Sequence, residues 1–172
     1  MQGSPDGISE SVAPPRLWDR HASPISFLIL AAIMIAALAG LTGGQPSRPR
    51  HAETDTALLS VKTPEVIRNG EFFETRIMVV AKQPLTDAVI AVSPGLWHDM
   101  TINTMIPAPG DERFADGSYR FSYGPIAAGD RLEVKVDGQI NPPLFAGNRG
   151  TIALYDGDRP IGSRKIEIKV LP

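Results

Sequence analysis

The sequence has no cysteine, few histidines and few aromatic residues. None of its 172 residues is Cys, three are His, and 6% are Phe, Trp or Tyr. The lack of Cys excludes disulfides, thiolate nucleophiles, iron–sulfur clusters and Cys-ligated zinc. Zinc held by histidine needs several ligands, and residues 57–172 contain only His98. We therefore expect neither a bound metal nor a cofactor.

The chain also lacks an excess of charge of either sign. Seventeen Lys and Arg residues stand against nineteen Asp and Glu residues, which gives a formal net charge of −2 at pH 7. A nucleic-acid backbone is held by a basic surface, so this balance predicts that the chain binds no nucleic acid.

The sequence motifs of common enzymes are absent as well. No Gly-x-Ser-x-Gly elbow, phosphate-binding loop or dinucleotide fingerprint occurs. A Ser-His-Asp triad would have to use His98, whose neighbour Asp99 is expected to point elsewhere. Asp111 and Glu112 lie beside Arg113 in what reads as a solvated loop, so they do not predict a glycosidase pair. These absences predict a protein without catalytic activity.

One long uncharged stretch divides the chain. Residues 1–23 are rich in Ser, Pro and Gly without apolar periodicity, which predicts a disordered or extended tail. Residues 24–44 carry no charge and are largely apolar. As a helix rising ~1.5 Å per residue, the stretch and its uncharged flanks are long enough for a ~30 Å hydrocarbon core. We expect residues 24–44 to form one transmembrane helix in a lipid bilayer, and residues 45–56 to form a juxtamembrane linker.

Two other interpretations of this stretch remain open. Ala37 and Ala39 before Gly40 also fit the cleavage site of a signal peptide. A buried helix of a soluble domain is disfavoured, because the rest of the chain is expected to be all strand. In an anchor, small residues would allow close contact with a neighbouring helix, and the candidates are Ala32, Ala36, Ala39 and Gly40.

The charges beside the stretch do not decide its orientation. Arg16 and Arg20 precede it, and Arg48 and Arg50 follow it, so the positive-inside rule gives a tie. A short tail before one anchor and a folded domain after it is the ordinary layout of a signal anchor. We therefore expect a cell inner-membrane protein with a cytoplasmic N-terminus and a periplasmic C-terminal domain.

Residues 57–172 alternate apolar and polar side chains with a period of two. Leu132, Val134 and Val136, for example, alternate with charged residues. Such alternation predicts strands with one face on a core and the other in water. The predicted strands are 57–62, 72–80, 85–92, 101–106, 118–123, 131–140, 150–155 and 163–170. The same period predicts Tyr119 and Phe121 on the core side and Arg120 in water.

Turn dipeptides punctuate these strands. They are Asn69-Gly70, Asp116-Gly117, Gly129-Asp130, Asp137-Gly138 and Asp156-Gly157. Together the strands and turns predict an all-β fold: an immunoglobulin-like antiparallel β-sandwich of seven to eight strands over residues 57–172, preceded by one transmembrane α-helix.

Two resemblances agree with this interpretation. The segment FSYGPIAAGDRLEVKVDGQI resembles part of bacterial extracytoplasmic immunoglobulin-like modules. The segments RHASPISFLIL, DMTINTMIP and GQINPPLFAG resemble a group of uncharacterised small single-pass membrane proteins of proteobacteria with such a domain. That group has no assigned activity, so the resemblance implies a fold and a location but transfers no functional residue.

Two loops, residues 93–110 and 141–149, carry large apolar side chains that strand alternation explains least. The candidates for contact with a partner are Trp97, Met100, Leu144 and Phe145. Alternatively, these side chains plug the open ends of the sandwich. We expect an accessory or structural subunit whose partners are integral membrane proteins of a larger bacterial complex. The other hypothesis is a membrane-displayed ligand- or surface-binding module.

Overall fold

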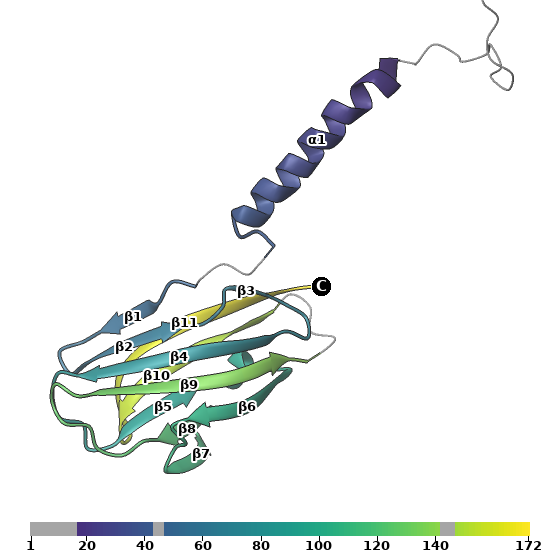
Figure 1. Cartoon of the computed structure of the whole chain (residues 1–172). Coiled ribbons are helices and arrows are strands. Elements are labelled where there is room, and N and C mark those ends of the chain that lie inside the picture. The colour runs from purple at the N-terminus through teal and green to yellow at the C-terminus, as the bar shows by residue number, and fades with distance from the viewer. Residues whose placement is uncertain (1–16, 43–46, 142–146) are drawn as a thin grey trace, which may run out of the picture. The chain divides into compact units, whose positions relative to one another are not determined.

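The computed structural model describes residues 17–42, 47–141 and 147–172, with side chains from residue 24 onward (Figure 1). The chain divides into two compact units, Met1–Leu41 and Thr42–Pro172. Among the described residues, helix α1 belongs to the first unit and the strands belong to the second.

Helix α1 spans Leu17–Leu38 and contains Pro24. It begins within the predicted tail, and Gly40 ends it. Gly40 has a φ of +80°, and its N–H donates to the Ala37 carbonyl while the Leu41 N–H donates to the Ala36 carbonyl. This is a Schellman cap, which needs a left-handed residue and therefore favours glycine. Ala32 and Ala36 lie in the helix, whereas Ala39 and Gly40, also predicted to pack within a helix, lie in the turn after it.

The apolar side chains of α1 are largely exposed. Phe27, Leu28 and Leu30 are 70%, 66% and 63% exposed. In the described part of the chain, no helix meets the combined length and apolarity needed to cross a membrane. Residues 43 and 44, the end of the predicted span, lie outside the described residues.

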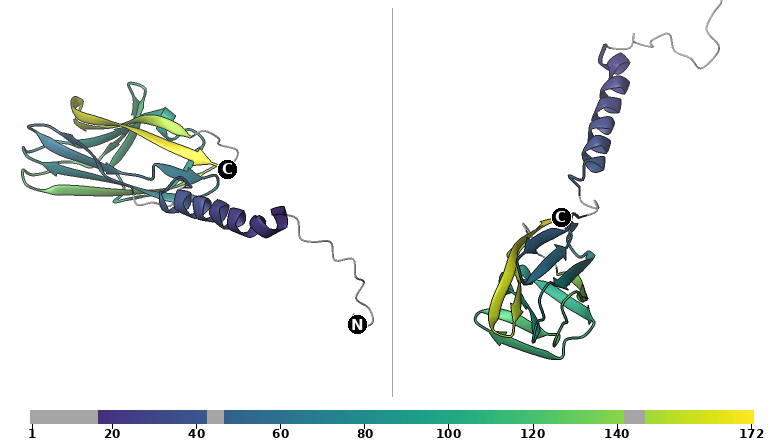
Figure 2. Two further views of the ribbon diagram at one scale, coloured as in Figure 1. Left: turned by 90° about the horizontal axis from the view of Figure 1, so that it is seen from above. Right: turned by 90° about the vertical axis from the view of Figure 1, so that its left-hand side faces the viewer.

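The strands form two sheets, so the predicted β-sandwich is confirmed as an architecture (Figure 2). The five-stranded sheet runs β1 (Arg50–Glu53), β2 (Ala57–Lys62), β4 (Phe72–Ala81), β9 (Arg131–Ile140) and β6 (Met100–Ile106). The six-stranded sheet runs β3 (Val66–Arg68), β11 (Arg159–Leu171), β10 (Asn148–Asp156), β5 (Ala88–Val92), β8 (Ser118–Ser122) and β7 (Asp111–Ala115). All neighbours are antiparallel except β3 and β11.

The core lies between the sheets and follows the predicted register. In β9, Val134 and Val136 are buried, while Arg131 and Glu133 are exposed. In β11, Ile166, Ile168 and Val170 are buried between exposed charged residues. Burying apolar surface between the sheets is the main force that stabilises such a domain.

Three strands were missed by the sequence analysis, namely β1, β3 and β7. Strand β1 lies inside the predicted linker 45–56, and β7 replaces the loop expected around Glu112. Both are edge strands rich in charge, so they lack the alternation that a half-buried strand shows. The predicted turn Asp137-Gly138 was also wrong, because both residues lie within β9. Gly138 pairs there with Phe73, whose ring occupies the space above it.

Candidate functional site

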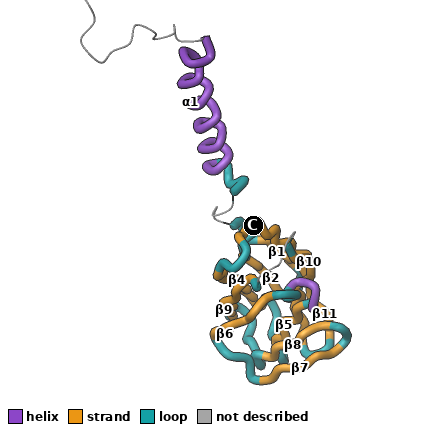
Figure 3. The backbone as a smooth tube through the Cα atoms, turned by 90° about the vertical axis from the view of Figure 1, so that its right-hand side faces the viewer, coloured by secondary structure: helices purple, strands orange, loops and turns teal. Residues whose placement is uncertain are grey.

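Strands β6 and β7 are the edge strands of the two sheets at one side of the sandwich (Figures 1 and 3). An apolar groove is lined by residues of both strands. Its volume is about 560 Å³. Strand β6 contributes Ile102, Asn103, Thr104 and Met105, and the β6–β7 connection contributes Ala108 and Pro109. The remaining lining residues are Trp97, Glu112, Arg113, Phe114, Tyr119 and Phe121.

Aromatic rings form the floor and one wall of the groove. Trp97 stacks on Tyr119 with ring centroids 6.2 Å apart and lies 5.6 Å from Phe121. Phe114 meets Tyr119 edge-on at 5.2 Å. These separations are those of favourable aromatic pairs, so the rings support one another in a continuous surface.

The short 3₁₀ helix η1 (Pro94–Leu96), drawn in Figure 3 as a short purple segment among the strands, comes directly before Trp97. The Trp97 N–H donates to the Pro94 carbonyl at 3.1 Å, and Leu96 is buried below. The buried Asn148 amide donates to the Leu96 carbonyl at 3.2 Å and also to the His98 carbonyl. Hydrogen bonds therefore hold the main chain on both sides of the indole, which fixes the groove floor before any ligand arrives.

The face of β7 that points toward the core lines the groove, and the other sheet does not cover it. Glu112 pairs with Phe121 across the ladder, and Phe114 pairs with Tyr119. Paired residues of an antiparallel ladder point to one face, so Glu112 and Phe114 lie on the core side with Phe121. Phe114 is nevertheless 61% exposed and Tyr119 41%. These two aromatic side chains therefore lie on the core face of their strands and are still in contact with water.

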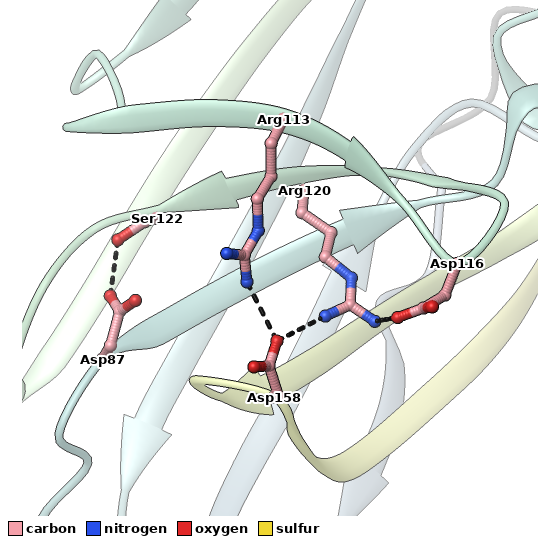
Figure 4. A network of polar contacts seen from close by, with 6 residues as sticks. All are labelled: Asp87, Arg113, Asp116, Arg120, Ser122 and Asp158. Carbon is pink, nitrogen blue, oxygen red and sulfur yellow. Dashed lines mark hydrogen bonds and ion pairs between the residues drawn. The ribbon is translucent and has the colours of Figure 1, made fainter.

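A cluster of ion pairs on the outer face holds this wall in place (Figure 4). Asp158 accepts hydrogen bonds from Arg120 of β8 at 3.0 Å and from Arg113 of β7 at 2.9 Å. Asp116 accepts a second bond from Arg120 at 2.6 Å, and the Tyr155 ring lies 4.6 Å from the guanidinium carbon. Arg120, predicted in water, is only 4% exposed as a result. Its charge is tolerated there because two carboxylates and a ring face compensate it.

The predicted contact residues have different fates. Trp97 lies in the groove, half-buried and packed against the core as well. Met100 starts β6 and packs against the core outside the groove lining. Leu144 and Phe145 lie outside the described residues. Phe114 and Tyr119 were not among the predicted contact residues. Neither the local charge nor the hydrophobic period of the sequence shows that the core face of β7 is left uncovered.

Polar groups also lie in and near the groove. No set of three His, Asp or Glu side chains is gathered for a metal ion in the described ranges 24–42, 47–141 and 147–172. The expectation that Asp99 points away from His98 was wrong, because His98 Nδ1 lies 2.9 Å from an Asp99 oxygen, with both side chains exposed. Burial, and to a smaller degree the charge of Glu112, raises the pKa of Tyr123 to about 12. The arrangement is suited to binding an apolar surface.

Comparison with family models found no match, and comparison with curated proteins found none either. Solved structures give weak likenesses. The chain is similar to a FixG-related protein from Vibrio parahaemolyticus, with a TM-score of 0.41 and 15% identity over 67% of this chain and 99% of that one. It is similar to the chitin-binding domain of a chitinase from Pyrococcus furiosus, with a TM-score of 0.41 and 14% identity over 66% of this chain and 100% of that domain. It is also similar to CaCohA2 from Clostridium acetobutylicum, with a TM-score of 0.43 and 12% identity over 68% and 93% of the two chains. Likenesses at this level transfer neither a function nor a site residue.

Proposed function

We propose that this chain is a non-catalytic, single-pass membrane protein that serves as an accessory subunit of a larger bacterial membrane complex. Its immunoglobulin-like β-sandwich lies on the periplasmic side of the inner membrane and contacts a partner protein. The observation that carries the proposal is the uncovered aromatic groove formed by Trp97, Phe114 and Tyr119.

The chemistry of the groove supports a protein partner. Trp, Tyr, Phe and Met are enriched at the centres of protein interfaces, where they lose water on contact and contribute most of the affinity. The groove presents all four residue types within one surface. Charged side chains flank it at Glu112 and Arg113, as in the polar rim of an interface.

The uncharged stretch supports the membrane anchor. From Pro24 to Pro46 no charged residue occurs, and the side chains of Phe27, Leu28 and Leu30 of α1 are mostly exposed. Apolar side chains on all sides of a helix need an apolar surrounding, and a lipid bilayer provides one. Ala32 and Ala36 offer a face for close contact with a helix of the partner.

Purification of the full chain from its own membranes in mild detergent tests the proposal. We expect integral membrane proteins to co-purify at a fixed ratio, measured by quantitative mass spectrometry. Phe114→Ala should reduce that ratio about tenfold, because an interface anchor contributes ~1.4 kcal/mol or more. Phe72→Ala is the matched control, since Phe72 is also an exposed strand phenylalanine but lies outside the groove.

Two results would contradict the accessory role. Equal retention of partners by both variants would exclude the groove as their contact. Purification of the chain alone would favour the second candidate function, a displayed ligand-binding module, whose supporting observation is the groove volume. A volume of about 560 Å³ falls within the range of small-molecule sites.

The proposed orientation has a separate test. Protease added to spheroplasts should remove the domain that follows Thr56 and spare the tail. Digestion of the tail with an intact domain would reverse the orientation.

A further inference from the structure

The two long sides of the sandwich are closed differently. On the β1 side, Arg50 of β1 donates to the Lys165 carbonyl of β11, and Arg164 of β11 donates to the His51 carbonyl of β1. These bonds join the two sheets. On the other side the six-stranded sheet ends in β7 and the five-stranded sheet ends in β6, with the groove between them. The sheet that ends in β6 has one strand fewer.

The residues of β7 show that its core face is uncovered. All residues from Asp111 to Phe114 are exposed, on the core face as well as on the outer face. A further strand beside β6 would lie over the core face of β7, because packed sheets stack about 10 Å apart and neighbouring strands are about 4.8 Å apart. It would cover Phe114 and Tyr119.

Strand β6 is also an edge strand without a charged residue or a proline to hinder strand addition. Proteins usually protect edge strands with charge, proline, shortness or a bulge. Strand β1 carries Arg50, His51 and Glu53, β7 carries three charges, and β3 has only three residues. The seven residues of β6, MTINTMI, include no charge, and their one irregularity is a bulge between Ile102 and Thr104.

The main chain of Ile102 faces this open edge. The Asn141 N–H donates to the Asp99 carbonyl, and the register continues with Met100 opposite Ile140 and Ile102 opposite Gly138. Bonded and non-bonded pairs alternate along an antiparallel ladder. The pair Ile102 and Gly138 is therefore non-bonded, so the Ile102 N–H and C=O point away from β9 and can bond an added strand.

From these observations we infer that β6 accepts one extended segment of the partner protein as a sixth strand of its sheet, an inference that rests on the proposed function. The segment carries apolar side chains at alternate positions, facing Phe114 and Tyr119. It also carries a Lys or Arg that reaches Glu112, whose carboxylate lies on the core face and makes no ion pair within the described residues. Main-chain bonds to β6 supply affinity, and the groove selects the side chains.

A second copy of this chain does not fit the same place. The added strand must carry a Lys or Arg opposite Glu112, and β6 of another copy, with the sequence MTINTMI, has no charged residue. An extended segment of a partner protein with a basic residue meets that requirement.

Amide hydrogen exchange of the full chain in detergent, alone and with its co-purified partner, tests the inference. We expect exchange at the Ile102 amide to slow about tenfold or more in the complex, while Arg50–Glu53 at the opposite edge is unchanged. Ile102→Pro, which removes the N–H at the open edge without removing a bond to β9, should lower partner retention about tenfold. Ile102→Val, which keeps the N–H, should retain the partner.

The outcomes separate the two proposals. A partner retained by Ile102→Pro, or unchanged exchange at Ile102, would overturn strand addition and leave the accessory role standing. Absence of any partner would overturn both. A complex with twice the mass of the chain would show a second copy instead. If the Ile102→Pro variant does not fold, the Glu112→Lys variant provides the test. Partner retention at the wild-type level by that variant would refute the inferred Lys or Arg of the added segment.

Discussion

Replacing Gly138 by alanine should destabilise the domain by acting on the strand that supports the groove. Gly138 lies in β9 between Phe73 of β4 and Ile102 of β6. An added Cβ would lie 2.7 Å from Phe73 Cζ, 3.0 Å from Phe73 Cε1 and 3.3 Å from the Thr101 carbonyl oxygen. Carbon atoms in contact prefer about 3.5–4.0 Å, so the methyl group overlaps the ring by about 1 Å.

The ring cannot yield freely, because Phe73 is 7% exposed and belongs to the core. Overpacking of this kind costs about 2 kcal/mol, which for a domain of this size lowers Tm by about 6–10 °C. Thermal unfolding of the full chain, followed by circular dichroism at the sheet signal, measures the loss. Gly162→Ala is the matched control, since its Cβ would meet neighbours at 3.5 and 3.6 Å and should be close to neutral.

A double-mutant cycle identifies the cause. In the Phe73→Leu background the ring is gone, so Gly138→Ala should cost less than about 0.5 kcal/mol, a coupling of about 1.5 kcal/mol. Equal losses in both backgrounds would refute the reasoning. The clash would then lie with the Thr101 carbonyl, and β6 itself would be displaced.

Three further predictions concern the core, a buried hydroxyl and the ion-pair cluster. Val134→Asp should cost at least about 4 kcal/mol and Lys135→Asp less than about 0.5 kcal/mol in denaturant titrations; equal damage would mean a register shifted by one residue. Tyr123→Phe should remove a loss of stability between about pH 10 and 12: the folded pKa is raised from 10.0 to about 12, so the contribution is complete below pH 10 and declines as pH rises through 12. Because the Tyr123 hydroxyl is buried and has no hydrogen-bond partner among the residues that the structure describes, the variant should be no less stable than wild type at pH 7; a weaker variant there would imply a bonded hydroxyl. Asp158→Ala should loosen β7, seen as faster amide exchange at Arg113 with β9 unchanged, and equal exchange in both strands would contradict this.

The strands that bury one face could be predicted from the sequence. Alternation fixed β2 and β9 to the residue and the core register of β11. The Asp137-Gly138 dipeptide was wrongly predicted to form a turn. Gly138 instead pairs with Phe73 across the sheet, and the ring of Phe73 fills the space that a side chain at position 138 would occupy. This pairing overrides the local preference of Asp-Gly for a turn.

The groove could not be predicted in this way. It lies where the edge strands β6 and β7 leave the core face of β7 uncovered, which depends on the whole topology and not on a local pattern. Strand β7 was hidden, since a strand exposed on both faces has no hydrophobic period. The prediction that Arg120 is exposed to water was wrong for a different reason. A charged side chain on the outer face was assumed to be in water, whereas Asp116, Asp158 and Tyr155 cover this one.

Both walls of the groove pair with a neighbouring strand through main-chain bonds, but their further support differs, and this bears on how a partner would be selected. The β7 wall also depends on Asp158, which is 83% exposed, so its ion pair with the half-exposed Arg113 is weak and screened by salt. The β6 wall is tied to β9 by main-chain bonds and by the Phe73–Gly138 packing, which salt does not weaken. A strand added to β6 would therefore meet a firm edge on one side and an adjustable wall on the other. Under the proposed function, β6 and the aromatic floor would set affinity, while β7, through Glu112, would adapt to the side chains presented to it.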